Sequence, residues 1–247
     1  MDKMNELLKK LYSSKWEKIS YMLQSFNKEK PNDSKNSATH PLLIKTNKEY
    51  ETSDFKVMFF GQETNYWERE TNDGAFEEGI DIETLLNRYD IFYLKRGYEG
   101  YGGHFWNFIR KLKNSEIDKK IGYVWNNVLK IGKCGKGYPE QGLINYTFEY
   151  FNVISQEIEI LKPNVLLFLS SYRYDEFIKR SLGNFSIIPI DGFNKNELCI
   201  LKFDNLSVDL ALRTYHPGYL HRLGKERMNK ILNKIRVDIH TAGMILC

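Results

Sequence analysis

The sequence predicts an α/β fold in which helices cover both sides of a mostly parallel sheet. From residue 55 onward, apolar segments of strand length alternate with segments of helical periodicity, and this alternation is typical of parallel sheets. The continuous apolar run of residues 165–169 suits a strand that is buried on both faces. With 247 residues, 42% of them hydrophobic, the chain is long enough for one domain with a sizeable core.

The elements follow in order along the chain. Residues 4–24 carry leucines and isoleucine near helical spacing, with lysines between them, and predict an amphipathic helix. Residues 27–40 are polar and contain a proline, which predicts a linker or long loop. The first helix is too short to bury a core of its own, so we divide the chain into an N-terminal helix with its linker (residues 1–50) and an α/β domain (residues 51–247). Strands are expected over residues 55–60, within 123–131, and over 164–170, 187–190, 198–203 and 208–212, and helices over 104–112, 146–161, 172–182 and 225–240.

The formal net charge of +4 is modest, but basic residues gather near the end of the chain. Such a stretch suits a partner rich in phosphate, and a solvated helix face is the alternative. Between residues 213 and 236 the only acidic residue is Glu226, against Arg213, Arg222, Lys225, Arg227, Lys230, Lys234 and Arg236.

Cysteine use and hydropathy exclude several classes of protein. Cys134, Cys199 and Cys247 are far apart and form no Cys-x-x-Cys pair, which argues against a disulfide framework, a zinc site or an iron–sulfur cluster. No apolar run approaches the length of a membrane span, and no signal-peptide pattern opens the chain. We therefore expect a cytoplasmic protein that needs no metal or cofactor and does not enter a membrane.

Two expected strands run into polar turns that suit catalysis. One strand leads into Gly61, Gln62 and Glu63, and another is followed by His216 and Pro217. Proline fixes its own φ and restricts the residue before it, which would hold the imidazole still beside a substrate. Ligands of parallel sheets bind beyond the carboxyl ends of the strands, so the carboxylate and the histidine are expected at one site.

These motifs resemble those of the uracil-DNA glycosylase superfamily. The resemblance covers roughly residues 55–240. It implies a three-layer α/β/α fold with a central, mostly parallel four-stranded sheet, extended here by the N-terminal helix. Five segments follow the order of the family: Gly61-Gln62-Glu63-Thr64-Asn65-Tyr66 (the water-activating motif), Gly74-Ala75-Phe76, Gly103 to Leu112, Val124 to Leu129, and Tyr215-His216-Pro217-Gly218-Tyr219-Leu220.

The resemblance implies a role for each motif in removing a base from DNA. Glu63 would orient the attacking water and stabilise the cationic sugar, in place of the aspartate of the family. His216 would donate a hydrogen bond to the negative charge that develops on the departing base. The positions of the family's proline and tyrosine hold Thr64 and Asn65 here, and Tyr66 follows.

Further residues would bind the flipped base. Phe76 would stack on it, although packing of this side chain into the core is the alternative. Asn126 would pair with the edge of the base. Asn127 is the alternative, because adjacent strand residues face opposite sides and only one of the two can line the pocket. Gln62 and Tyr66 would border the same pocket.

The last motif implies contacts with the DNA backbone and stack. Leu220 would insert into the duplex as an apolar wedge, with Tyr219 as the alternative wedge. The glycine at 218 would offer its backbone N–H to a phosphate. The remaining candidate phosphate contacts are Gln62, His104, His221 and Arg222.

The sequence thus favours a monomeric DNA glycosylase that releases uracil or a related damaged base from DNA. The alternative is a catalytically inactive protein on the same fold that binds nucleic acid or a nucleotide. A third hypothesis is an interaction protein whose first helix exposes an apolar stripe along Leu7, Leu8 and Leu11 to a partner.

Overall fold

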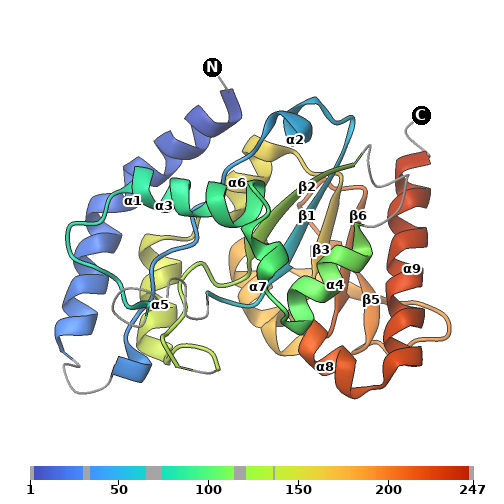
Figure 1. Cartoon of the computed structure of the whole chain (residues 1–247). Coiled ribbons are helices and arrows are strands. Elements are labelled where there is room, and N and C mark those ends of the chain that lie inside the picture. The colour runs from blue at the N-terminus through green and yellow to red at the C-terminus, as the bar shows by residue number, and fades with distance from the viewer. Residues whose placement is uncertain (1–2, 30–33, 65–73, 114–120, 136, 245–247) are drawn as a thin grey trace.

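A computed structural model describes residues 3–29, 34–64, 74–113, 121–135 and 137–244. Its centre is a six-stranded mixed sheet with the strand order β2-β1-β3-β6-β5-β4. Helices pack on both sides of this sheet (Figure 1). The α/β class with helices on both faces is therefore confirmed. The expected four-stranded sheet is wrong, because the sheet has six strands.

The four strands at one side of the sheet are parallel. They are β2 (Ile121–Asn127), β1 (Phe55–Gly61), β3 (Val165–Phe168) and β6 (Leu210–Thr214). All seven residues of β2 and all four of β3 are buried, as their apolar sequences predict for strands covered on both faces.

The two additional strands form an antiparallel extension. Strand β5 (Leu198–Phe203) pairs antiparallel with β6, and β4 (Phe185–Pro189) pairs antiparallel with β5. Most of β4 is exposed, as is usual for an edge strand, and its final proline suits an edge because it cannot donate to a ladder. The sequence pattern did predict strands here; the count of four came from the family resemblance.

The helices form a layer on each side of the sheet (Figure 1). Their bounds are α1 (Lys3–Lys28), α2 (Lys48–Thr52), α3 (Ile82–Tyr89), α4 (His104–Leu112), α5 (Gln141–Tyr150), α6 (Ile154–Leu161), α7 (Asp175–Leu182), α8 (Pro217–Arg222) and α9 (Lys225–Met244). There are also a π-helical segment η3 (Asp90–Leu94) and 3₁₀ turns η1 (Ser34–Asn36), η4 (Gly97–Gly100) and η6 (Tyr172–Tyr174).

Contacts between helices define the two layers. On one side of the sheet, α1 contacts α3, α5 and α6, and α6 contacts α7. On the other side, α4, α8 and α9 contact one another. The short helix α2 contacts β2.

The N-terminal helix belongs to the same core as the sheet. Its buried residues Leu8, Tyr12, Ile19, Leu23 and Phe26 join the central hydrophobic cluster. The segment after it is also buried around residues 38–44, where we expected a polar linker as far as residue 40. The hypothesis of an exposed apolar stripe on the first helix is not supported, since Leu8 is buried and Leu11 packs against the core, although Leu7 is 42% exposed.

Other boundaries differ from expectation for local reasons. The helix expected over residues 146–161 is two helices, because the backbone leaves the helical conformation at Phe151 (φ −140°), which is itself buried. The strand expected over residues 208–212 lies two residues later. Its ladder with β3 begins at Leu210, opposite Val165, so Arg213 and Thr214 are part of the strand.

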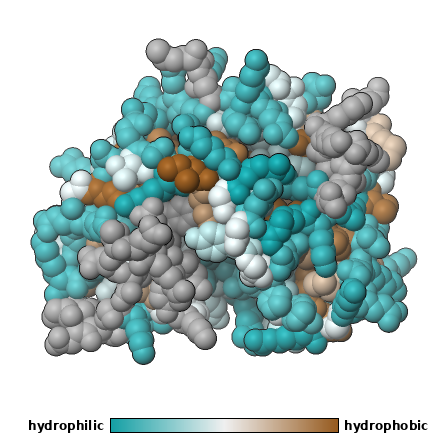
Figure 2. Space-filling model, viewed as in Figure 1, coloured by the Kyte–Doolittle hydropathy of each residue, from teal (hydrophilic) through white to brown (hydrophobic). Residues whose placement is uncertain are grey.

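The surface is predominantly hydrophilic on the face shown in Figure 2, and hydrophobic residues gather only in small groups there. None of the helices in the described part of the chain is both long enough and apolar enough to span a membrane.

Candidate active site

The carboxyl ends of the four parallel strands meet at one edge of the sheet. The register pairs Gly61 with Asn127, Phe60 with Phe168, and Phe168 with Arg213. The turns that follow β1, β3 and β6 therefore start at the same level, and helix α8 begins directly beyond this edge (Figure 1). This is where ligands bind in sheets of this kind, and both Glu63 and His216 lie there, as predicted.

Glu63 lies in the turn after β1 and is only partly accessible to solvent. Its Oε2 accepts a hydrogen bond from the hydroxyl of Tyr174, a buried residue. Burial raises the pKa of Glu63 to about 7, while the Tyr174 hydrogen bond and the positive charge of Lys133 act in the opposite direction. A carboxyl group with a pKa near neutral is suited to accept a proton from water and release it again.

Thr64 holds this turn in place. Its Oγ1 lies 2.5 Å from Oγ1 of Thr39, and the backbone N–H of Gly132 donates to both hydroxyls at 2.9 and 3.0 Å. A side chain at 132 would collide with the backbone carbonyl oxygen of Thr64. Thr64, which stands where the resemblance expects a proline, is thus a structural residue, and Thr39 in the segment after α1 supplies its partner.

His216 is oriented by the start of helix α8. Its Nδ1 accepts a hydrogen bond of 3.1 Å from the backbone N–H of Gly218, and Pro217 occupies the first turn of the helix. Phe105, on α4, stacks against the imidazole with ring centroids 5.7 Å apart and an angle of 17°. Burial, and secondarily the electrostatic effect of His104, lower the pKa of His216 to about 4.

These contacts determine the protonation state of His216. A pKa of about 4 leaves the ring neutral at physiological pH, and a neutral ring has one donor nitrogen and one acceptor nitrogen. Because Nδ1 accepts from Gly218, the proton is on Nε2. His216 therefore presents an N–H donor without carrying a charge.

Asn127, not Asn126, faces this site. The side chain of Asn127 lies beside Gly61, where an added Cβ atom would be 2.5 Å from its Oδ1 and 3.4 Å from Phe105. Its Nδ2 is buried and has no hydrogen-bond partner among the described residues. A buried polar group without a partner is rare in proteins, and here it leaves a donor for a ligand.

Asn126 lies on the opposite face of β2, so its predicted role at the pocket is wrong. Its Nδ2 donates to Oε2 of Glu157 at 2.8 Å, and its Oδ1 accepts from Nζ of Lys130 at 2.8 Å. Lys130 and Glu157 form a buried ion pair at 2.8 Å, to which Tyr12 on α1 adds a hydrogen bond of 2.6 Å. Both amide atoms of Asn126 are therefore engaged in the interior.

The other base-binding candidates lie as follows. Gln62 is in the turn after β1, and its Nε2 donates to the backbone oxygen of Ser170 at 2.8 Å. Phe76 is only 6% exposed and packs against Trp16 and His40, with ring centroids 6.1 and 5.6 Å away. This is the core-packed position that we gave as the alternative for Phe76. Tyr66 lies outside the described residues.

The candidate DNA contacts divide into exposed and buried groups. The imidazoles of His104 and His221 are exposed and stacked, with centroids 4.1 Å apart, and Arg222 is also exposed. The N–H of Gly218 donates to His216, so it is not available to a phosphate. Leu220 is completely buried and cannot act as a wedge, whereas Tyr219 beside it is 45% exposed.

Several residues at this edge of the sheet were not among the predicted site residues. Tyr174 stood only within an expected helix, and Phe105 only within the segment from Gly103 to Leu112, yet they contact Glu63 and His216. Ser170, directly beyond β3, has a buried hydroxyl without a partner among the described residues. Ser171 has a φ of 76°, a left-handed conformation that is uncommon for serine and often marks a functional turn.

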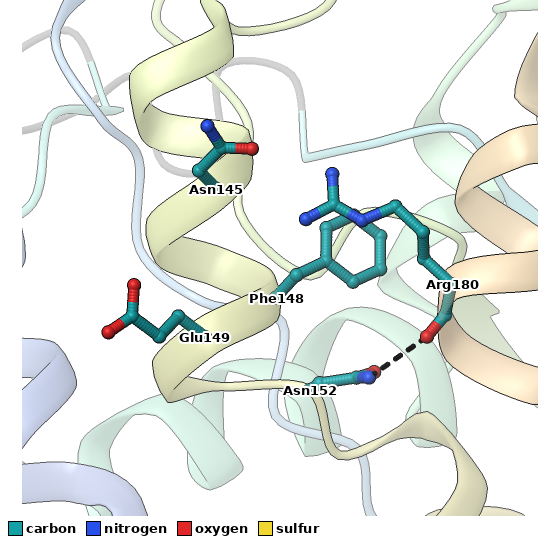
Figure 3. Close-up of a pocket in the computed structure, with 5 residues that line it drawn as sticks. All are labelled: Asn145, Phe148, Glu149, Asn152 and Arg180. Carbon is teal, nitrogen blue, oxygen red and sulfur yellow. Dashed lines mark hydrogen bonds between the residues drawn. The ribbon is translucent and has the colours of Figure 1, made fainter.

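A separate hollow lies between α5 and α7, away from these residues (Figure 3). The guanidinium of Arg180 lies 3.9 Å from the ring centroid of Phe148. Asn152 donates a hydrogen bond of 3.2 Å to the backbone oxygen of Arg180, as drawn in Figure 3. Asn145 and Glu149 complete the lining, and none of the predicted site residues takes part.

No protein-family model matches the chain, and no curated protein matches it in sequence. Within the described residues, no group of three or more His, Cys, Asp and Glu side chains is arranged to hold a metal ion.

Proposed function

We propose that this protein is a DNA glycosylase with the fold of the uracil-DNA glycosylase superfamily, and that it releases uracil or a related damaged base. The observation that carries the proposal is the neutral His216, whose Nε2–H is available as a donor at the sheet edge that also holds Glu63. A fixed, uncharged donor can stabilise the departing base, and a carboxylate can position the attacking water and stabilise the cationic sugar, and these are two main roles in the hydrolysis of an N-glycosidic bond.

The reaction follows from these two residues. The bond between the base nitrogen and C1′ of the sugar breaks, and its electron pair leaves with the base. His216 stabilises the resulting negative charge through a hydrogen bond from Nε2 to a base oxygen. Glu63, in its ionised form, stabilises the cationic sugar and accepts a proton from the water that attacks C1′. The base anion takes up a proton from the solvent and Glu63 releases the proton that it accepted, so the products are the neutral free base and an abasic site.

Asn127 is the proposed reader of the flipped base. Its buried Nδ2 has no partner in the described structure, and Gly61 leaves the space that its amide occupies. An amide offers both a donor and an acceptor to the edge of a base. Phe105 forms a flat apolar wall beside His216 and would supply the aromatic contact that the family resemblance assigned to Phe76.

We also propose the partner, the oligomeric state and the location of the protein. DNA is the partner, and the protein acts as a monomer in the cytoplasm, where Cys134 and Cys199 remain the free thiols that the structure shows. The exposed pair His104 and His221, together with Arg222, is available for phosphate contacts at the mouth of the site.

The test is an alkaline-cleavage assay on labelled oligonucleotides, single- and double-stranded, that carry uracil, hypoxanthine or a G·T mismatch. We expect cleavage at uracil, and a fall in rate of roughly 10²- to 10³-fold in His216→Ala, the usual effect of losing one preorganised donor. Glu63→Gln should also be strongly impaired. His240→Ala is the matched control. His240 lies near the end of α9, where Gly243 is beside Phe55 at the start of β1, whereas Glu63 and His216 follow the carboxyl ends of their strands. Base release that survives both site substitutions would refute the assignment.

One contact favours the second candidate function, a nucleic-acid- or nucleotide-binding protein without catalysis. The hydroxyl of Tyr174 bonds the Glu63 carboxyl group and occupies one of the positions where an attacking water would be held. DNA binding at low salt without release of any base would support this alternative.

A further inference from the structure

A tyrosine-rich surface borders the candidate active site. We define the tyrosine surface as Tyr138, Tyr172, Tyr215 and Tyr219. Tyr138 is 45% exposed, Tyr172 40% and Tyr219 45%, and Tyr215 is half-buried between Tyr172 and Tyr219. An exposed apolar patch on a protein surface often marks a binding site, so this group of exposed rings is a candidate for one.

The ring of Tyr215 contacts those of Tyr172 and Tyr219, and the ring of Tyr138 contacts that of Tyr174. Tyr215 lies 6.2 Å from Tyr172 and 4.5 Å from Tyr219 between ring centroids, and it directly precedes His216 in the chain. On the other side, Tyr138 lies 5.6 Å from Tyr174, whose hydroxyl bonds Glu63. The tyrosine surface thus adjoins both proposed catalytic groups.

Arg173 adds a positive charge to the tyrosine surface. Its guanidinium is fully exposed, interacts with the hydroxyl of Tyr172, and lies within electrostatic range of Tyr138 and Tyr219. The carboxylates that follow Arg173 in the chain, and the one that lies near Tyr215, are each paired with another cation, so they do not neutralise the charge of Arg173. Those ion pairs are Asp175 with Arg213 at 3.2 Å, Glu176 with Lys179 at 2.8 Å, and Glu197 with Arg227 at 2.5 Å.

We propose that the tyrosine surface, with Arg173, binds the unpaired nucleotides that flank the target base in single-stranded DNA. This inference rests on the proposed function and specifies its substrate. Exposed aromatic rings stack on any unpaired base, and an arginine among them holds the backbone phosphate.

The structure favours a single strand over a duplex for two reasons. In a duplex the faces of the bases are hidden in the stack, so they cannot meet the tyrosine rings. In addition, Leu220 is completely buried in α8, and no leucine projects from this helix to hold a duplex open. Tyr219, the exposed neighbour, already contacts Tyr215.

The experiment is a fluorescence-anisotropy titration with a labelled 15-nucleotide DNA that contains no damaged base, as a single strand and as a duplex, over a range of salt concentrations. Tyr172→Ala and Tyr219→Ala should each weaken single-strand binding by roughly 5- to 150-fold, the usual effect of losing one stacked base. The phenylalanine variants at both positions should bind nearly as tightly as the wild type, because they keep the ring. Tyr21→Ala is the control, since Tyr21 is 67% exposed on α1, outside this surface.

Arg173→Gln gives an independent measure. It should reduce the slope of log affinity against log salt by about 0.7, the value for one lost phosphate contact on a single strand. Duplex binding as tight as single-strand binding would overturn the proposal. So would no measurable single-strand binding, or alanine variants that bind as well as the phenylalanine variants.

The outcomes separate this inference from the proposed function. The oligonucleotide holds no target base, so its binding depends on the tyrosine surface and not on catalysis. Single-strand binding that needs the tyrosine rings, without base release from any of the oligonucleotides that carry uracil, hypoxanthine or a G·T mismatch, would support the surface and refute the glycosylase. Base release from duplex DNA with no single-strand preference would support the glycosylase and refute the surface.

Discussion

The hydroxyl of Tyr174 donates a hydrogen bond to Oε2 of Glu63, and this bond links the turn after β3 to the turn after β1. Burial alone would hold the Glu63 carboxyl group protonated well into the neutral range. The Tyr174 bond and the charge of Lys133 favour the ionised form instead, and the balance leaves a pKa of about 7. The ionisation of Glu63 is therefore controlled in part by the neighbouring side chains of Tyr174 and Lys133.

Replacing Tyr174 with phenylalanine should shift the pH dependence of base release. Removing a hydrogen bond to the ionised carboxylate raises its pKa, so the acidic limb of the rate profile should move from about pH 7 in the wild type to higher pH. The measurement is the single-turnover rate of base release between pH 5 and 9.

The plateau at high pH distinguishes two roles of this bond. A plateau equal to or above that of the wild type means that Tyr174 only tunes Glu63, since the carboxylate is then free to hold water. A lower plateau with an unmoved limb would mean that Tyr174 positions the carboxyl group without affecting its ionisation.

The same pKa shift predicts that Glu63 destabilises the fold at neutral and higher pH. The pKa of Glu63 is about 7 in the folded protein, against 4.5 for an ordinary glutamate, so between these values the unfolded chain binds fewer protons than the native one. The free energy of unfolding therefore falls as the pH rises from about 4.5 to 7, by at most about 3 kcal/mol from this group. Urea unfolding should show Glu63→Gln more stable than the wild type at pH 8.

At pH 4.5 and below, Glu63 is protonated in the folded protein, so the advantage of the glutamine should be small there. A stability gain of equal size at both pH values would trace to packing and not to ionisation. Glu83→Gln is a suitable control, because Glu83 on α3 is exposed.

His216 should remain neutral across the physiological range. Its pKa of about 4 lies below the ordinary value of 6.5, so its contribution to stability is complete above pH 6.5 and is lost as the pH falls towards 4. In NMR spectra the ring should show a proton on Nε2 and no titration above about pH 5. His104→Ala should raise the pKa of His216, because His104 lowers it. A His216 midpoint near 6.5 in the wild type would contradict the buried, neutral assignment.

The sequence predicted the parts of this molecule that depend on local pattern. Strands buried on both faces are visible as continuous apolar runs such as residues 165–168, and the His216-Pro217 corner is visible because proline restricts its neighbour. The meeting of Glu63 and His216 at one edge followed from the general behaviour of parallel sheets.

Features that depend on long-range contacts could not be predicted in this way. The burial of the segment around residues 38–44 comes from partners far along the chain, such as the Leu42 N–H that donates to the carbonyl of Lys130. The burial of Leu220 likewise depends on how α8 packs against α4 and α9. The choice between Asn126 and Asn127 required the register of β2, and one residue of shift exchanges the two faces.

Substitutions of Asn126 and Asn127 give the most direct test of the site. Asn127→Ala should impair base release with little loss of stability, because its Nδ2 has no partner in the described structure. Asn127→Asp should alter which base is released, since a carboxylate cannot donate to the base edge. Asn126→Ala should instead lower the free energy of unfolding by about 1–3 kcal/mol or more. The buried Nζ of Lys130 and Oε2 of Glu157 would each lose the hydrogen bond that they make with Asn126.

The two variants are matched in chemistry and adjacent in sequence, so each serves as the control for the other. Chemical denaturation and uracil release are measured on both, and base release is compared at a temperature where both are folded. If Asn126→Ala changes base preference while Asn127→Ala only destabilises, the pocket lies on the α6 side of β2 and the site proposed around Gly61 and Phe105 is wrong. The opposite pattern places the base beside His216, where the leaving-group hydrogen bond needs it.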